Sequence, residues 1–115
     1  MECEACGHEN AEGVWLQIAG LYQEELGDWS RAVEAYERAA EDPATPLAEV
    51  RYRQGECLEK AEDIDGAIAR YEQAAAGGGA DPFRIAALAE IGRIAEERGD
   101  WNGAIAAYER IISAG

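Results

Sequence analysis

The apolar residues of this chain recur at helical spacing along almost its whole length. From about residue 12 onward they return every three or four positions, which is the spacing of amphipathic helices. Breaks that carry glycine, proline or aspartate divide this pattern into six helical stretches, at about 12–25, 30–41, 46–60, 65–76, 82–97 and 101–113. No stretch alternates apolar and polar residues as a half-buried strand does, so the sequence predicts an all-α fold.

Three of these stretches repeat one another in sequence. They read GDWSRAVEAYERAA (27–40), EDIDGAIARYEQAA (62–75) and GDWNGAIAAYERII (99–112). Alanine, tyrosine and a helix-capping aspartate each recur in one column, at Ala32, Ala67 and Ala104, at Tyr36, Tyr71 and Tyr108, and at Asp28, Asp63 and Asp100. A repeat of this period predicts supersecondary units that bury their apolar faces only against their neighbours. We expect three antiparallel helical hairpins at about 12–43, 46–76 and 82–113, in one domain over 12–115 that follows a leader over 1–11.

Glycine also recurs inside the first helix of each predicted hairpin, at Gly20, Gly55 and Gly92. A glycine within a helix costs about 1 kcal/mol relative to alanine, so its repetition indicates close approach between helices. The repeated tyrosines could form a platform for a ligand, but their fixed register with the small residues favours a place in the core.

These columns resemble the tetratricopeptide repeat. The third unit reads Leu88-x2-Ile91-Gly92-x2-Ala95 followed by Ala104-x3-Tyr108, and the other two units carry the matching columns. The resemblance implies a right-handed α-α superhelix, or solenoid, of three such hairpins and six helices, which binds another protein along a concave groove. Trp15 and Tyr22 lie one place ahead of the family's columns, so we expect the first helix to be slightly shifted in register.

The resemblance also implies which residues line the concave groove, namely those of the first helix in each hairpin that face away from the core. The candidate peptide-binding residues are Gln17, Leu21, Glu24, Tyr52, Glu56, Glu59, Arg93 and Glu96. Glu24, Glu59 and Glu96 fall in one column, which favours a basic or mixed peptide. A solvated helix face is the alternative interpretation. Family members that grip a terminal carboxylate use lysine, arginine and asparagine here, a pattern that this chain does not match.

The charge of the chain narrows its partners further. It has 24 acidic and 10 basic residues, for a formal net charge of −14. Such a surface repels nucleic acid and anionic membranes and favours basic partners, although the acidic residues could simply keep the protein in solution. No 18-residue apolar run and no signal-peptide pattern is present. The three cysteines do not form a complete disulfide set, so we expect a reducing, cytoplasmic setting.

The leader contains the only sequence signal for a metal. Cys3, Cys6 and His8 form one knuckle of the kind seen in zinc ribbons, whereas a complete structural site needs four ligands. Zinc shared between two chains, no role in the isolated chain and an oxidisable thiol pair are the alternatives. The fold itself is expected to require no cofactor. Cys57 lies in an apolar helical column and should be a buried structural residue.

No catalytic constellation is present, so an enzyme is not expected. His8 is the only histidine, and the run Gly77–Gly79 lacks the strand and the lysine of a phosphate-binding loop. The leading hypothesis is a protein–protein interaction module. The alternative is an oligomerisation or scaffold segment that self-associates through Tyr108, Ile111 and Ile112, because these isoleucines replace the alanines of the earlier copies. A piece of a longer repeat array would explain the same isoleucines.

Overall fold

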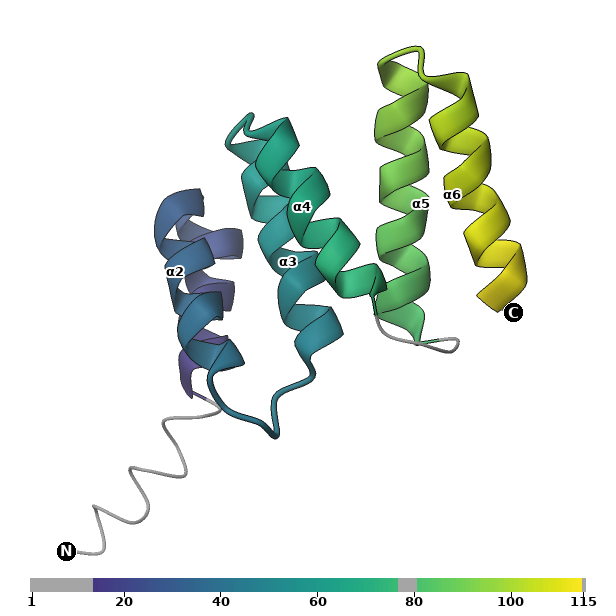
Figure 1. The fold of residues 1–115 in the computed structure, drawn as a ribbon. Coiled ribbons are helices and arrows are strands. Elements are labelled where there is room, and N and C mark those ends of the chain that lie inside the picture. The colour runs from purple at the N-terminus through teal and green to yellow at the C-terminus, as the bar shows by residue number, and fades with distance from the viewer. Residues whose placement is uncertain (1–13, 77–80, 115) are drawn as a thin grey trace, which may run out of the picture.

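The chain is a row of three helical hairpins in the computed structural model, which describes residues 14–76 and 81–114 (Figure 1). The first helix is α-helical over residues 14–20 and continues as a π-helix, η1 (Leu21–Leu26). The others are α2 (Trp29–Ala40), α3 (Leu47–Lys60), α4 (Ile64–Ala75), α5 (Pro82–Glu97) and α6 (Trp101–Ala114). The described residues contain no strand, and the expected all-α helical repeat fold is confirmed.

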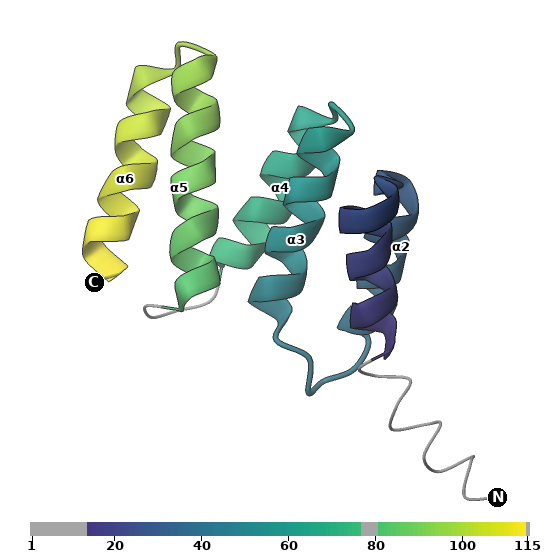
Figure 2. The same cartoon turned by 180° about the vertical axis from the view of Figure 1, so that it is seen from behind.

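The hairpins stand side by side, so the molecule is a single row that is two helices thick. In the first two hairpins the first helix lies on one side of the row and the second helix on the other, whereas α5 and α6 stand beside each other at the end of the row (Figures 1 and 2). The structure measures 57 × 29 × 17 Å along its principal axes. At each junction the second helix of one hairpin packs on the first helix of the next, α2 on α3 and α4 on α5.

Each inner turn is built from the aspartate that the sequence analysis assigned to it. The carboxylates of Asp28, Asp63 and Asp100 accept hydrogen bonds of 3.2, 3.0 and 3.0 Å from backbone N–H groups three residues later. These bonds satisfy donors that the first turn of a helix leaves free, and the predicted capping role is confirmed. The residue before each aspartate has a left-handed backbone, which reverses the chain at the end of the preceding helix.

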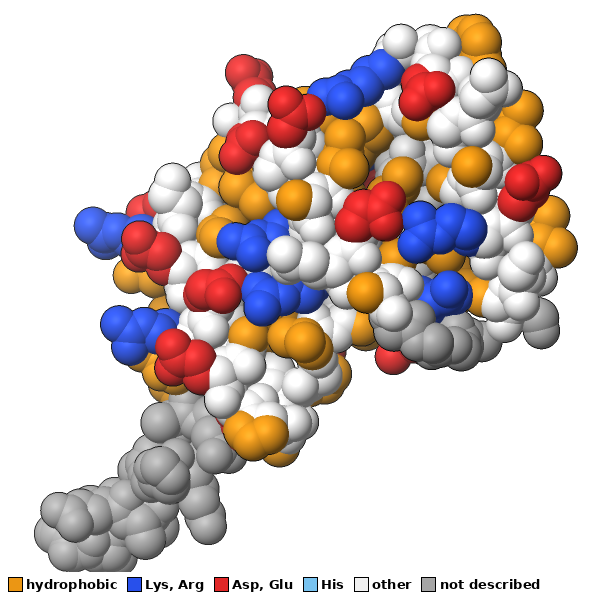
Figure 3. Space-filling model, in the orientation of Figure 1, with side chains coloured by type: hydrophobic (Ala, Val, Ile, Leu, Met, Phe, Trp, Pro, Cys, Tyr) orange, Lys and Arg blue, Asp and Glu red, His pale blue; other side chains and the backbone are white. Residues whose placement is uncertain are grey.

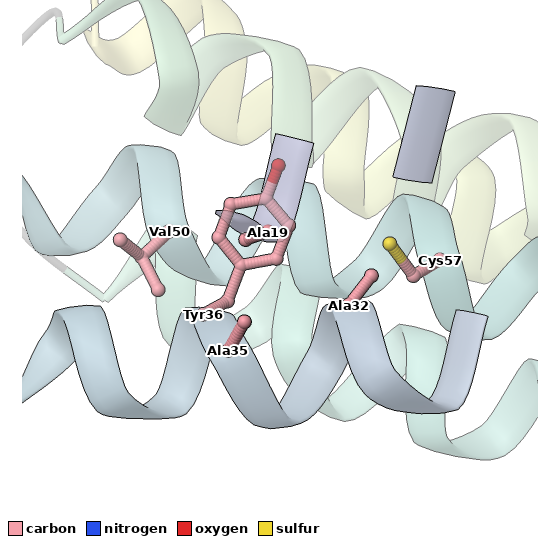
Figure 4. Packing of buried hydrophobic residues seen from close by; sticks show 6 residues of the cluster. All are labelled: Ala19, Ala32, Ala35, Tyr36, Val50 and Cys57. Carbon is pink, nitrogen blue, oxygen red and sulfur yellow. The ribbon is translucent and has the colours of Figure 1, made fainter. Parts of the chain in front are cut away.

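The core lies between successive helices and is made largely of alanine. Its first cluster joins the first hairpin to α3 through Ala19, Ala32, Ala35, Tyr36, Val50 and Cys57 (Figure 4). A second cluster joins α4 to α5 around Tyr71 and Ile94. Cys57 is fully buried, as expected, and burial raises the pKa of its thiol to about 12. Alanine at these positions lets the helix backbones approach closely.

Two of the three repeated glycines accommodate a tyrosine ring. A Cβ atom on Gly55 would lie 2.5 Å from the ring of Tyr71, and one on Gly92 would lie 2.7 Å from the ring of Tyr108. Close approach is therefore confirmed at both positions. The same prediction is wrong for Gly20, because a Cβ there would meet nothing within 4 Å.

The π-helix explains why Gly20 differs from its counterparts. The N–H of Asp28 donates to the carbonyl of Tyr22, six residues earlier, whereas Asp63 and Asp100 donate to carbonyls five residues earlier, on Leu58 and Ala95. The first hairpin thus holds one extra residue, which the wider π turn accommodates. The expected register shift is confirmed, and the counterpart of Gly55 and Gly92 is the fully buried Ala19.

Candidate functional site

A hollow of about 460 Å³ runs across the first helices of the three hairpins. The first helix and α3 lie toward the viewer in Figure 2. We call this hollow the acidic groove, and its lining residues are Gln23, Glu24, Trp29, Glu56, Glu59, Lys60, Tyr71, Glu90 and Arg93. Four carboxylates thus face two cationic side chains. The one-residue shift in the first helix brings Gln23 to the place that Glu59 occupies in the second hairpin.

Arg93 is the centre of an ion-pair network that joins α5 to α3. Its guanidinium contacts the carboxylate of Glu59 on α3, that of Glu90 at 2.6 Å and that of Glu97 at 2.9 Å. Hydrogen bonding to Glu59, followed by the contacts with Glu90, raises the pKa of Arg93 above its ordinary value. The positive charge of Arg93 is already shared among three carboxylates. Arg93 therefore holds acidic side chains in position, and the groove keeps its negative charge.

Two buried tyrosines hold other polar side chains of the groove in place through hydrogen bonds. The hydroxyl of Tyr71 donates to Glu59 at 2.9 Å, and the hydroxyl of Tyr36 donates to the side-chain oxygen of Gln23 at 2.6 Å. Gln23 in turn donates to Glu56 at 3.2 Å. Burial is the main cause that raises the pKa of Tyr36 to about 12 and that of Tyr71 further still, so both hydroxyls remain donors at neutral pH.

The carboxylate of Glu24 differs from its neighbours in the groove. It is exposed, and it forms no ion pair with any other residue that the structure describes. Trp29, the first residue of α2, lines the same hollow. The groove therefore combines an unpaired carboxylate with an aromatic surface, which together suit a long cationic side chain.

Comparison with known proteins identifies the family of this helical repeat. The family model of the tetratricopeptide repeat matches residues 19–85 and 60–115, which together cover most of the chain. The chain belongs to the tetratricopeptide repeat family. Tetratricopeptide repeats generally mediate protein–protein interactions. Among curated proteins, the search finds no match.

The acidic groove of this tetratricopeptide repeat chain contains four of the eight peptide-binding residues expected from the sequence. These are Glu24, Glu56, Glu59 and Arg93. Gln17 and Leu21 instead line a separate hollow of about 430 Å³ on the first helix, which Glu24 also borders. Tyr52 is half-buried and packs against the second core cluster, with its ring 5.7 Å from those of Tyr71 and Phe83. Glu96 is exposed and does not line the groove. The pKa of Tyr108 is raised mainly by desolvation and then by the nearby charge of Glu96.

Sequence reasoning missed Trp29, Glu90, Gln23 and Tyr71 as groove residues. Glu90 stands three residues before Arg93, a spacing that favours an ion pair on a helix and could have indicated it. Gln23 could have been found by following Trp15 and Tyr22, which already suggested a shift of one residue. Trp29 carries no such signal, since its place beside the groove depends on how two hairpins pack.

The expected self-association residues lie at different depths on α6. The ring of Tyr108 sits over Gly92, and Ile111 is half-buried, whereas Ile112 is 77% exposed. Trp101 and Ile105, which were not among the predicted residues, are exposed as well, at 64% and 54%. Apolar side chains accordingly appear along the outer edge of the molecule on the α6 side (Figure 3).

Cys3, Cys6 and His8 lie outside the described residues. Within residues 14–76 and 81–114, no group of three histidine, cysteine, aspartate or glutamate side chains is arranged to hold a metal ion. No helix of that same part is long and apolar enough to cross a membrane.

Proposed function

We propose that this chain is a non-enzymatic interaction module of three tetratricopeptide repeats, which binds a basic segment of a partner protein in the acidic groove. The observation that carries the proposal is the charge of the groove. Glu24, Glu56, Glu59 and Glu90 line it, while one of its two cations, Arg93, is already paired with three carboxylates.

The groove is well suited to a preorganised binding site. Glu56 and Glu59 are held in place by Arg53, Gln23, Tyr71 and Arg93, so little side-chain freedom remains to be lost when a ligand binds. Glu24 remains for a cation of the ligand, and Trp29 in the same groove lining offers a surface for the aliphatic part of a lysine or arginine side chain. The net charge of −14 adds long-range attraction for a basic partner.

Fluorescence anisotropy with labelled peptides of equal length tests this proposal. A peptide rich in lysine and arginine should bind more tightly than a neutral or an acidic one, and its affinity should fall as salt is raised from about 50 to about 500 mM. Glu24→Gln and Glu56→Gln should each weaken binding about two- to fivefold, the range of exposed charge pairs. Glu34→Gln, an equal charge change on an exposed residue of α2 outside the groove, is the matched control and should change nothing.

Two results would refute groove binding. One is equal affinity for the neutral and the basic peptide at low salt. The other is an effect of Glu34→Gln as large as that of Glu24→Gln, since a general change in protein charge would then explain both.

A second function, that of a self-associating scaffold segment, is supported by a separate observation. Ile112 is 77% exposed at a position where the earlier hairpins carry the packed alanines Ala40 and Ala75. A large apolar side chain at a repeat position that is otherwise packed favours contact with another protein surface.

A further inference from the structure

Exposed apolar residues on α6 occupy positions that are packed in the earlier hairpins. We call Trp101, Ile105 and Ile112 the C-terminal face. Ile105 corresponds to Val33 and Ile68, both of which pack against core clusters, and Ile112 corresponds to Ala40 and Ala75. In the earlier copies this surface meets the next hairpin: Gln54 of α3 donates to the carbonyl of Val33, and Arg84 of α5 donates to that of Ala75. On α6 the same surface is open.

The first helix, at the other end of the row, exposes the surface that in α3 and α5 meets the preceding hairpin. We call Val14, Ile18 and Leu21 the N-terminal face. Because Tyr22, Leu58 and Ala95 accept equivalent turn hydrogen bonds, these three residues correspond to Val50, Gln54 and Cys57 of α3 and to Ala87, Ile91 and Ile94 of α5. On α3 and α5 those residues are buried or half-buried beside the preceding hairpin. On the first helix, Val14 and Leu21 are 38% and 57% exposed, and all three line the hollow of about 430 Å³.

We propose that a second copy of this chain covers these surfaces, with the C-terminal face of one molecule on the N-terminal face of the next. This arrangement rests on the proposed self-association and gives it a direction. It continues between molecules the contact that the chain already makes twice within itself, α2 on α3 and α4 on α5. Each molecule carries both halves of the contact, so the assembly is head-to-tail and open-ended.

The charge of the chain predicts how this assembly responds to salt. Each copy has a net charge of −14, so the copies repel one another and added salt should strengthen their association. Binding of a basic peptide in the acidic groove responds in the opposite direction. The two activities can therefore be told apart in one preparation of the protein.

Sedimentation velocity of the full chain and of two double variants tests the direction. Ile105→Gln with Ile112→Gln blocks the C-terminal face, and Val14→Gln with Leu21→Gln blocks the N-terminal face, without any change of charge. Wild-type protein should grow beyond a dimer with concentration. Each variant alone should stay at the mass of one chain, 12.4 kDa, and an equal mixture of the two should form a dimer and stop there. Leu47→Gln, at an exposed leucine of α3 outside both faces, is the control and should behave as wild type.

Three results would overturn the proposal. If the variant with the blocked N-terminal face still dimerises while the other does not, α6 pairs with α6; the head-to-tail direction then fails although self-association stands. If the equal mixture stays monomeric, the two faces are not partners. If wild-type protein remains monomeric at about 1 mM in high salt, self-association itself fails. Circular dichroism checks the folding of each variant, and the single variants Ile112→Gln and Leu21→Gln replace any double variant that does not fold.

Discussion

The ring of Tyr71 lies directly over Gly55, so close that a Cβ atom on Gly55 would come within 2.5 Å of it. Tyr71 cannot yield easily, because its side chain is fully buried and its hydroxyl is bound to Glu59. Overpacking usually costs about 1–3 kcal/mol, whereas alanine gains about 1 kcal/mol over glycine in a helix. We therefore predict that Gly55→Ala lowers the free energy of unfolding by up to about 2 kcal/mol in total. Urea denaturation followed by circular dichroism measures the change.

Gly20 provides the matched control for Gly55. It lies in the first helix with no atom within 4 Å of the position that a Cβ would take. Gly20→Ala should therefore raise the free energy of unfolding by up to about 1 kcal/mol through helix propensity alone. Effects of the same sign in the two variants would contradict the proposed role of the Tyr71 ring.

Glu62 adopts a left-handed backbone, with φ of 68°, at the turn between α3 and α4. Glycine occupies the same place in the other two turns, at Gly27 and Gly99. A side chain in this conformation costs the folded state about 1–2 kcal/mol, and glycine removes that cost. Glycine also makes the unfolded chain more flexible, which offsets part of the gain in stability. Glu62→Gly should thus raise the free energy of unfolding by up to about 1 kcal/mol, measured by urea denaturation. Gly99→Ala should lower it by a similar amount, and stabilisation by that reverse change would refute the argument.

The thiol of Cys57 should be inert in the folded protein. Burial raises its pKa to about 12, and the side chain has no access to solvent. In a Cys3→Ser and Cys6→Ser background, alkylation by iodoacetamide at about pH 8 should be at least about a hundredfold slower than in urea, since reaction must await opening of the fold. Mass spectrometry follows the labelling. Complete labelling of the native protein within minutes would show that the junction between the first hairpin and α3 opens freely.

Glu37 should make a pH-dependent contribution to stability. A hydrogen bond from Gln54, followed by the contacts with Arg51, lowers its pKa below the ordinary value of 4.5. A lowered pKa in the folded state gives stability that is present above pH 4.5 and is lost as the pH falls through the folded value. At neutral pH, Glu37→Gln should be less stable than wild type by under about 1 kcal/mol, because the carboxylate is half exposed. Urea denaturation at decreasing pH should show this gap closing below pH 4.5, and an unchanged gap would refute the assignment.

The sequence was sufficient to predict the fold, because a repeat constrains every unit at once. Asp28, Asp63 and Asp100 indicated where the helices begin, and the glycine and tyrosine columns indicated which surfaces meet. The acidic groove was predicted only in part. Arg93 was expected among the peptide-binding residues, yet three carboxylates from two helices surround it. Such a network depends on the tertiary placement of α3 against α5, which helical periodicity does not contain.

The error at Gly20 has a different origin. Aligning it with Gly55 and Gly92 matches like with like, whereas the alignment that the structure requires pairs those glycines with Ala19. Residue chemistry favours the first alignment. Trp15 and Tyr22 indicate the second alignment, and the turn hydrogen bond from Asp28, which spans one more residue than its counterparts, decides for it. A single added residue inside a helix is therefore hard to recognise from composition alone.

The place of that added residue bears on how tolerant the chain is to changes in length. Two hydrogen bonds hold the structure around the added residue. The hydroxyl of Tyr36 donates to the side chain of Gln23, and the N–H of Asp28 donates to the carbonyl of Tyr22. The irregularity is thereby confined to a single turn, and the helix on its N-terminal side keeps step with α3 and α5. Deletion of one residue within 24–26 should shorten the helix locally without turning Val14 and Leu21 away from their present direction. An insertion or deletion elsewhere in a helix would rotate the whole segment on one side of the change about the helix axis.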